Sequence, residues 1–241
     1  MMRFALRLMG LVVVFGLTDV AQGLAQTATE QREAAVLKAR AGHMGDAQKE
    51  LRAMLAAGAD DNGLVAMDLA TLLQQDKKPR EAVAVFEKAA LTKPPDYALL
   101  AATRAYRDLR RYTDAARLAR EGQQRFPDQT VWPLLLSLVL SDARRPREAL
   151  AILRQPEAQR APPVERLLAK GYAWSRIRDW SKAKEAYAEA LKLAQNDQGA
   201  RAEATKALRD IGSAQTAVAQ GAPTGTPSAP GESAEAALGA G

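Results

Sequence analysis

One pattern recurs along the chain: REAVAVFEKAALTKP at residues 80–94, TDAARLAREGQQRFP at residues 113–127 and SKAKEAYAEALKL at residues 181–193. Two shorter copies are GDAQKELRAML at residues 45–55 and REALAIL at residues 147–153. Alignment of the copies places a small residue at the same position in each, and these residues are Ala47, Ala82, Ala115, Ala149 and Ala183. Their separations are 35, 33, 34 and 34 residues, so the sequence predicts stacked structural units of one kind.

The copies have the apolar spacing of paired helices. In the second unit, Leu69 and Leu73 lie on one predicted helix, and Val83 and Phe86 lie on the next, all at separations of three or four residues. The recurring alanine falls where two helices cross, because a small side chain lets the helix axes approach closely. Pro94 and Pro127 are expected to end the second helices of their units, and Pro156 to shorten that of the fourth.

The units resemble the tetratricopeptide repeat (TPR) over residues 28–196. Two units carry the resemblance best, through Leu69, Ala82, Phe86, Ala89 and Pro94 in the second and Leu167, Gly171, Trp174, Ala183, Tyr187 and Ala190 in the fifth. The resemblance implies an all-α, right-handed superhelical solenoid of about five helix-turn-helix units with a C-terminal capping helix. It does not specify a partner, because this family binds many unrelated ones.

Composition excludes several classes of site. The chain has 241 residues with 34 basic and 28 acidic ones, a net charge of +6, no cysteine and one histidine, His43. A chain without cysteine has no disulfide scaffold, thiolate metal site or cysteine nucleophile, and a single histidine cannot form a histidine metal cluster. Neither a glycine-rich phosphate loop nor a nucleophile elbow occurs, so we expect no enzyme, no metal and no cofactor.

Both ends of the chain differ in composition from the repeats. Residues 1–25, with Arg3, Arg7 and the apolar run LMGLVVVFGL at residues 8–17, are interpreted as a cleavable signal peptide, which predicts a periplasmic protein without a membrane span in the mature chain. Residues 197–220 are predicted to form the capping helix. Residues 221–241 contain five Gly and three Pro and are predicted to be a disordered tail. The capping helix is expected to pack through Ala202, Ala204, Leu208 and Ile211.

The resemblance implies a concave groove lined by the first helix of each unit. The side chains implied to bind the partner are Arg40, Met67, Gln74, Gln75, Tyr97, Leu100, Arg104, Arg107, Leu134, Leu138, Tyr172 and Arg176. The same register also places Arg32 and Asp142 in the groove. This mixture of apolar, amide and arginine side chains suits a peptide with acidic groups or a polar polymer.

The third unit is the most basic, with seven arginines between Arg104 and Arg125. Guanidinium groups recognise carboxylates and phosphates, so one interpretation is an acidic partner. The other is a solvated helix face with local charge pairs. Nucleic acid is disfavoured, because no aromatic residues alternate with the basic ones.

The remaining candidates are tryptophans and an aspartate pair. Trp174 is expected to pack in the core and Trp180 to stabilise a turn, while Trp132 is the tryptophan with most freedom to touch a ligand. The pair at residues 60–61 is interpreted as a solvated linker.

Two functional hypotheses follow. The first is a non-enzymatic periplasmic scaffold that binds an envelope protein or peptide in cell-envelope assembly or secretion. The second is an accessory of exopolysaccharide export that binds polysaccharide, because residues 133–153 are similar to the periplasmic repeats of exopolysaccharide export porins. In that family an outer-membrane barrel follows the repeats, whereas this sequence continues into a Gly/Pro-rich tail.

Overall fold

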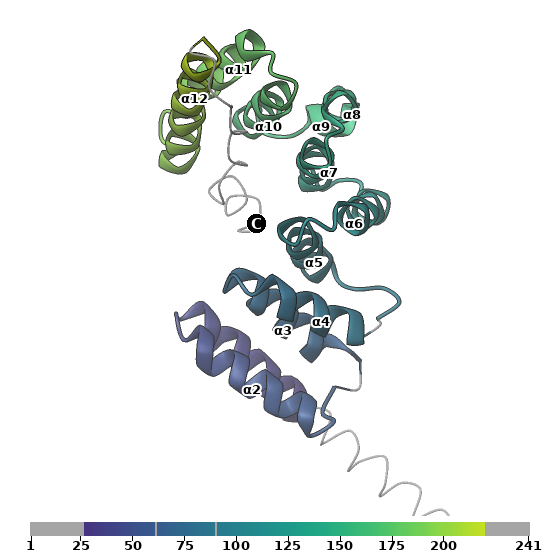
Figure 1. Cartoon of the computed structure of the whole chain (residues 1–241). Helices are drawn as coiled ribbons and strands as arrows, with labels where there is room; N and C mark the ends of the chain where they lie inside the picture. Colours follow the sequence, from purple (N-terminus) through teal and green to yellow (C-terminus); the bar gives the residue numbers. More distant parts are fainter. Residues whose placement is uncertain (1–26, 61, 90, 220–241) are drawn as a thin grey trace, which may run out of the picture. The chain divides into compact units, whose positions relative to one another are not determined.

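The computed structural model describes residues 27–60, 62–89 and 91–219 (Figure 1). Within those ranges the regular structure is helical and no strand occurs, which confirms the all-α class predicted from the sequence. None of the helices described is both long enough and apolar enough to span a bilayer. The predicted signal peptide at residues 1–25 and the predicted tail at residues 221–241 lie outside the described residues.

The chain divides into two compact units, residues 1–101 and 102–241, with the boundary inside one helix. Unit 1 contains a helix over residues 27–40 and then α2 (Met44–Ala56), α3 (Leu64–Gln75), α4 (Pro79–Ala89) and the first part of α5 (Asp96–Asp108). Unit 2 contains the rest of α5 and then α6 (Tyr112–Arg125), α7 (Val131–Asp142), α8 (Pro146–Ile152), α9 (Pro156–Gln159), α10 (Pro163–Arg176), α11 (Trp180–Leu193) and α12 (Gln198–Ala219).

Short turns join successive helices into hairpins, such as α3 with α4, α7 with α8 and α10 with α11 (Figure 1). We call the helix before each of these turns a first helix and the helix after it a second helix. The hairpins recur at the period predicted from the alanines. All five alanines are at most 1% exposed, which fits helices that approach closely at these positions.

The turns themselves repeat in atomic detail. One residue in each has a positive φ: Gly42, Lys77, Arg110, Arg144 and Arg178. The N–H of the next residue donates to the carbonyl five residues earlier, as in Lys78 N to Leu73 O (2.9 Å) and Arg145 N to Leu140 O (2.8 Å). This is the Schellman closure of a helix, and it satisfies carbonyl groups that the helix end would leave without a donor.

Proline accounts for the irregular fourth hairpin. Its second helix, α8, ends at Ile152, before Pro156, and Pro156 instead begins the four-residue α9. Proline is tolerated at the first position of a helix, because its missing N–H would have no partner there. The predicted shortening of this helix is therefore confirmed.

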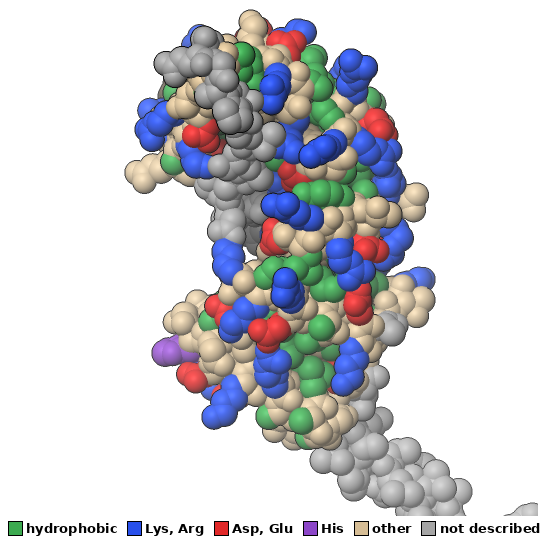
Figure 2. All heavy atoms as spheres, in the orientation of Figure 1, with side chains coloured by type: hydrophobic (Ala, Val, Ile, Leu, Met, Phe, Trp, Pro, Cys, Tyr) green, Lys and Arg blue, Asp and Glu red, His purple; other side chains and the backbone are tan. Residues whose placement is uncertain are grey.

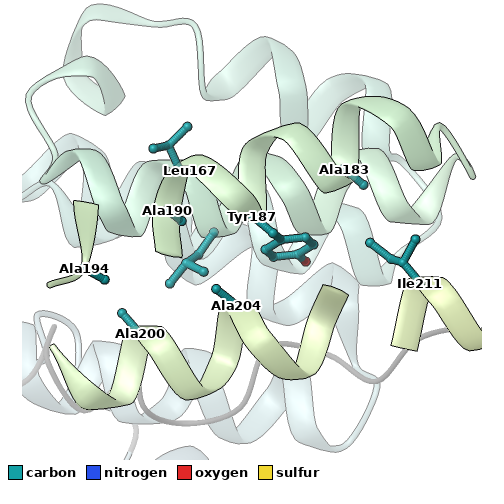
Figure 3. Packing of buried hydrophobic residues seen from close by; sticks show 9 residues of the cluster. Leu167, Ala183, Tyr187, Ala190, Ala194, Ala200, Ala204 and Ile211 are labelled. Atoms are coloured by element: carbon teal, nitrogen blue, oxygen red, sulfur yellow. The ribbon is translucent and has the colours of Figure 1, made fainter. Parts of the chain in front are cut away.

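Helix α12 covers the last hairpin of unit 2 (Figure 3). Its residues Ala200, Ala204 and Ile211 are buried against Tyr187 and Ala190 of α11. The expected contact through Ala202 is wrong, since that side chain is exposed and Ala200, half a helical turn earlier, is buried instead. The other three expected residues are in the packed face: Ala204 and Ile211 are buried, and Leu208 is partly buried against the same cluster.

Candidate functional site

The structure separates the twelve predicted groove residues by exposure. Six are buried: Met67, Gln74, Arg107, Leu134, Leu138 and Tyr172. Three are half-buried, Leu100, Arg104 and Arg176, and three are exposed, Arg40, Gln75 and Tyr97. Buried side chains offer a partner no surface in this conformation, so the first six pack the fold. That the other six bind a partner stays a prediction.

In unit 1, a buried carboxylate joins three helices. Asp68 on α3 is 6% exposed. Its Oδ2 accepts a 2.8 Å hydrogen bond from Nη1 of Arg32, on the helix over residues 27–40. Its Oδ1 accepts a 2.6 Å hydrogen bond from the Tyr97 hydroxyl, on α5. A buried charge is costly unless it is paired and hydrogen-bonded, and here each carboxylate oxygen has a donor.

Unit 2 contains the same arrangement around Asp142 of α7. Arg107 of α5, 7% exposed, donates from Nε to Asp142 Oδ2 over 2.7 Å. The hydroxyl of Tyr172, on α10, donates to Asp142 Oδ1. The guanidinium of Arg176 lies 5.9 Å from the centre of the Tyr172 ring. Arg107 is thereby committed to an internal ion pair instead of facing an acidic partner.

The two aspartate clusters have matching geometry. In each, the arginine precedes the aspartate by 36 or 35 residues and the tyrosine follows it by 29 or 30 residues. The sequence reasoning missed Asp68 and placed Asp142 in an open groove. One signal could have found both, because Asp68 and Asp142 are the only charged residues in α3 and α7, whose other residues are mostly apolar.

The tyrosines of these clusters remain protonated. Burial is the main cause that raises the pKa of Tyr97 above its usual value of 10.0, and the hydrogen bond to Asp68 adds to it. For Tyr172 burial again dominates, followed by the negative charge of Asp142. A phenol with a raised pKa donates a hydrogen bond at neutral pH and does not act as a base. Each cluster therefore holds helices together through hydrogen bonds that persist at neutral pH.

Both units contain a cavity between helices. In unit 1, α2, α3 and α4 border a mainly apolar cavity of about 490 Å³, whose lining includes Leu55, Leu69 and Val85. In unit 2, α10 and α11 border a cavity of about 290 Å³ lined in part by Trp174 and Lys182. Lys182 Nζ lies 4.4 Å from the centre of the Trp174 ring, so the lysine covers that face of the indole.

The expectation for Trp132 is wrong. Its side chain is fully buried and its ring stacks on Phe126, with a centroid separation of 6.2 Å and an interplanar angle of 20°. Its Nε1 donates to Gln129 Oε1 over 3.0 Å, which satisfies the one polar atom of the indole. Trp132 thus packs the core between α6 and α7 and cannot touch a ligand in this conformation.

The interpretation of Asp60 also changes. Its two carboxylate oxygens accept hydrogen bonds from the backbone N–H groups of Val65 (2.9 Å) and Ala66 (3.2 Å), at the start of α3. A carboxylate is favoured there by the unpaired N–H groups and by the helix dipole. Asp60 therefore caps a helix, and its neighbour at position 61 lies outside the described residues.

Among the residues that the structure describes, no three His, Asp or Glu side chains gather so that they could hold a metal ion. Comparison with known proteins adds no assignment: no family model, no curated protein and no solved structure matches the chain.

Proposed function

We propose that this chain is a non-enzymatic, exported TPR-type scaffold that holds a peptide segment of an envelope protein against its first helices. In this proposal the hairpins are the units of a right-handed superhelical solenoid, α12 is its cap, and residues 1–25 direct export to the periplasm.

One observation carries the proposal: the same turn closes five hairpins at TPR spacing. The residues with positive φ are separated by 35, 33, 34 and 34 residues, which equals the spacing of the five buried alanines. Independent folding elements would not share both a turn conformation and a crossing residue at one period. Repeats that each bury a face on their neighbours leave a continuous surface, and proteins of this architecture use that surface for binding.

The accessible first-helix residues define the chemistry of the peptide. In unit 1 these are Arg40, Gln75, Tyr97 and Leu100, which combine a cation, an amide and two apolar surfaces. The side-chain amide of Gln75 can pair with the backbone of an extended peptide, and Arg40 can pair with a carboxylate. In unit 2, Arg104 and Arg176 are the accessible members. We infer an extended segment with scattered acidic residues.

A protein partner is preferred to polysaccharide because of the tryptophans. Protein sites for sugar rings commonly use an open aromatic face. Trp132 is buried and one face of Trp174 is covered by Lys182. Trp132, the tryptophan predicted to be most able to contact a sugar ring, is therefore excluded in this conformation. Polysaccharide binding is kept as the alternative outcome of the experiment below.

Site-specific photo-crosslinking in living cells tests the proposal. A photoreactive phenylalanine analogue replaces Gln75, exposed on first helix α3, or Lys49, exposed on second helix α2. We expect one discrete crosslinked protein from position 75, found in the periplasmic fraction, and none from position 49. Adding Arg40→Glu should weaken the crosslink from position 75.

Three outcomes would contradict the proposal. Equal crosslinking from both positions would mean that the partner does not bind preferentially to the first helices. A crosslink from position 75 that Arg40→Glu leaves unchanged would argue against an acidic peptide. Retention of the protein on an exopolysaccharide column with no protein crosslink would favour the export-accessory alternative.

A further inference from the structure

The second helices of unit 2 carry a set of exposed arginines that the first-helix groove does not use. Six arginines are exposed and form no ion pair within the part of the chain that the structure describes. They lie in the turns before α6 and α8, on these two helices and directly after α8, and they are Arg110, Arg117, Arg120, Arg144, Arg147 and Arg154. We call this set the arginine face. Figure 2 shows Lys and Arg side chains gathered where Figure 1 draws α6 and α8.

The carboxylates near the arginine face are engaged by other arginines. Asp114 accepts from Arg111 over 2.8 Å, and Glu148 accepts two hydrogen bonds of 2.6 Å from Arg145. The Arg145 guanidinium, joined by the charge of Arg120, lowers the pKa of Glu148. The local acids are thus already paired, and the arginine face keeps an excess of positive charge.

The repeat places several of these arginines at equivalent positions of successive hairpins. Arg110 and Arg144 occupy the same turn position in successive hairpins, and Arg120 and Arg154 are also 34 residues apart. Helices α6 and α8 both pack on α7, and the charge of Arg120 on α6 reaches Glu148 on α8. Arg117 and Arg120 are three residues apart on one helix, so their Cβ atoms are about 5–6 Å apart. The result is an array of guanidinium groups carried by two second helices that flank α7.

Folding stability does not account for this array. Arg117 and Arg120 are like charges at a three-residue separation, which destabilises a helix. Arg147 lies in the first turn of α8, where the helix dipole disfavours a cation. The dipole does favour Arg110 at the end of α5, but that turn position needs a positive φ, and the first hairpin fills it with Gly42. Binding to a partner of opposite charge would account for the presence of these arginines.

The residue type narrows the chemistry of the partner. Every basic residue between Lys93 and Lys170 is an arginine. The planar guanidinium binds a carboxylate or phosphate through two parallel hydrogen bonds, which the point charge of lysine cannot do.

The surroundings of the arginines select among anionic partners. Large exposed apolar side chains in the described chain are Leu37, Tyr97, Leu193 and Val218, and none belongs to the arginine face. Stacking of nucleic-acid bases needs aromatic platforms, and interfacial membrane binding needs apolar side chains that insert. An acidic helix presents carboxylates every three or four residues, which matches the spacing of Arg117 with Arg120 and of Arg144 with Arg147.

We propose that the arginine face binds a carboxylate-rich, helical segment of a partner protein. This site lies on the second helices of unit 2 and is separate from the first-helix groove of the proposed function, so either site can exist without the other.

Fluorescence anisotropy with the full chain tests this inference. The probe is a fluorescein-labelled helical peptide with glutamates at three- and four-residue spacing in an alanine background. We expect the combined substitutions Arg117→Gln, Arg120→Gln, Arg144→Gln and Arg147→Gln to weaken binding at least ~10-fold at low salt, and added salt to weaken binding to the unsubstituted chain.

A matched control removes the same charge from unit 1. The exposed residues Lys49, Arg80, Lys88 and Lys93 are replaced by Gln, and we expect binding within about 2-fold of the unsubstituted chain, because none of these four residues belongs to the arginine face. Circular dichroism checks that both variants are folded. If the fourfold variant does not fold, Arg117→Gln with Arg120→Gln on the exposed face of α6 gives the same readout.

The proposal is overturned by any of three results: no binding of the acidic peptide, equal weakening by the variant and the control, or tighter binding of poly(U) RNA or phosphatidylglycerol vesicles than of the peptide. The crosslinking at Gln75 is unaffected by each of these results, so the two proposals fail separately.

Discussion

Gly122 lies so close to the indole of Trp132 that a Cβ on residue 122 would come within 2.2 Å of the ring. Gly122 is on α6 and Trp132 on α7, and both are buried. Glycine is required here because the helix backbone itself forms the wall against which the tryptophan packs. This single contact explains how the Trp132 side chain can be completely buried between α6 and α7.

Replacing Gly122 by alanine should therefore destabilise the chain. Trp132 cannot give way, since it is enclosed on all sides, and overpacking of this kind costs about 1–3 kcal/mol. Urea denaturation followed by circular dichroism measures the loss. The matched control is Gly212→Ala on α12, where an added Cβ meets nothing within 4 Å. It should stabilise by roughly 0.5–1 kcal/mol, because alanine favours helix. Equal effects of the two changes would refute the packing.

The strained turns predict a stabilising substitution. Arg110 holds φ at 59°, a conformation in which an L-residue is disfavoured and glycine is not. Arg110→Gly should raise the free energy of unfolding by about 0.5–1 kcal/mol, and Gly42→Ala, at the equivalent turn, should lower it by about 1 kcal/mol. As a control, Arg117→Gly in the helical part of α6 should be destabilising by a similar amount. A loss of stability in Arg110→Gly would contradict the turn geometry.

The hydrogen bond from Tyr172 to Asp142 predicts a large effect of removing one oxygen. Tyr172→Phe leaves a carboxylate that is only 11% exposed without one of its donors, which should cost about 1.5–3 kcal/mol, as for hydrogen bonds to charged groups. Tyr97→Phe should cost less, because Tyr97 is 38% exposed and water can replace its hydroxyl. Tyr112 forms no hydrogen bond through its side chain within the described residues, so Tyr112→Phe, the control, should stay within about 0.5 kcal/mol of the parent. Thermal and urea unfolding both report these values.

The raised pKa of Tyr172 gives stability a defined dependence on alkaline pH. The folded chain retains the phenolic proton above the ordinary pKa of 10.0, whereas the unfolded chain loses it. Because the folded state then binds more protons than the unfolded state, stability is intact below pH 10 and falls as pH rises above it. Burial raises the pKa of Tyr187 in the same direction. Tyr172→Phe should reduce the slope of stability against pH above 10, and an unchanged slope would refute the assignment.

The repeat could be predicted from sequence because its signals are local. The buried alanines and the helix ends near Pro94, Pro127 and Pro156 follow from side-chain size and from the missing proline N–H, and neither depends on distant partners. The hairpin turns could also be placed. The backbone conformation of these turns could not be predicted, because the positions with positive φ hold Lys77 and three arginines. A glycine at these positions would have indicated a positive φ.

Burial of polar and aromatic side chains was harder to predict, because it depends on pairings between helices. From the sequence, Arg107 is predicted to be an exposed cation, whereas in the structure it pairs with Asp142, 35 residues away. From the sequence, Trp132 is predicted to be accessible to a ligand, whereas in the structure it packs against the backbone of α6 at Gly122. The unpaired arginines of α6 and α8 could not be identified from the sequence for the same reason. Only the structure shows which arginines pair with the neighbouring acidic residues and which form no ion pair among the described residues.

The Asp142 cluster has a consequence for how unit 2 opens. A single carboxylate at the end of α7 takes donors from α5 and α10, so detaching either helix leaves this charge without one of its donors. Such an intermediate is unfavourable, and the three helices should fluctuate open together instead of fraying one by one. Their slowest backbone amides should exchange with deuterium at a common rate, whereas residues near the end of α12, away from any such junction, should exchange sooner.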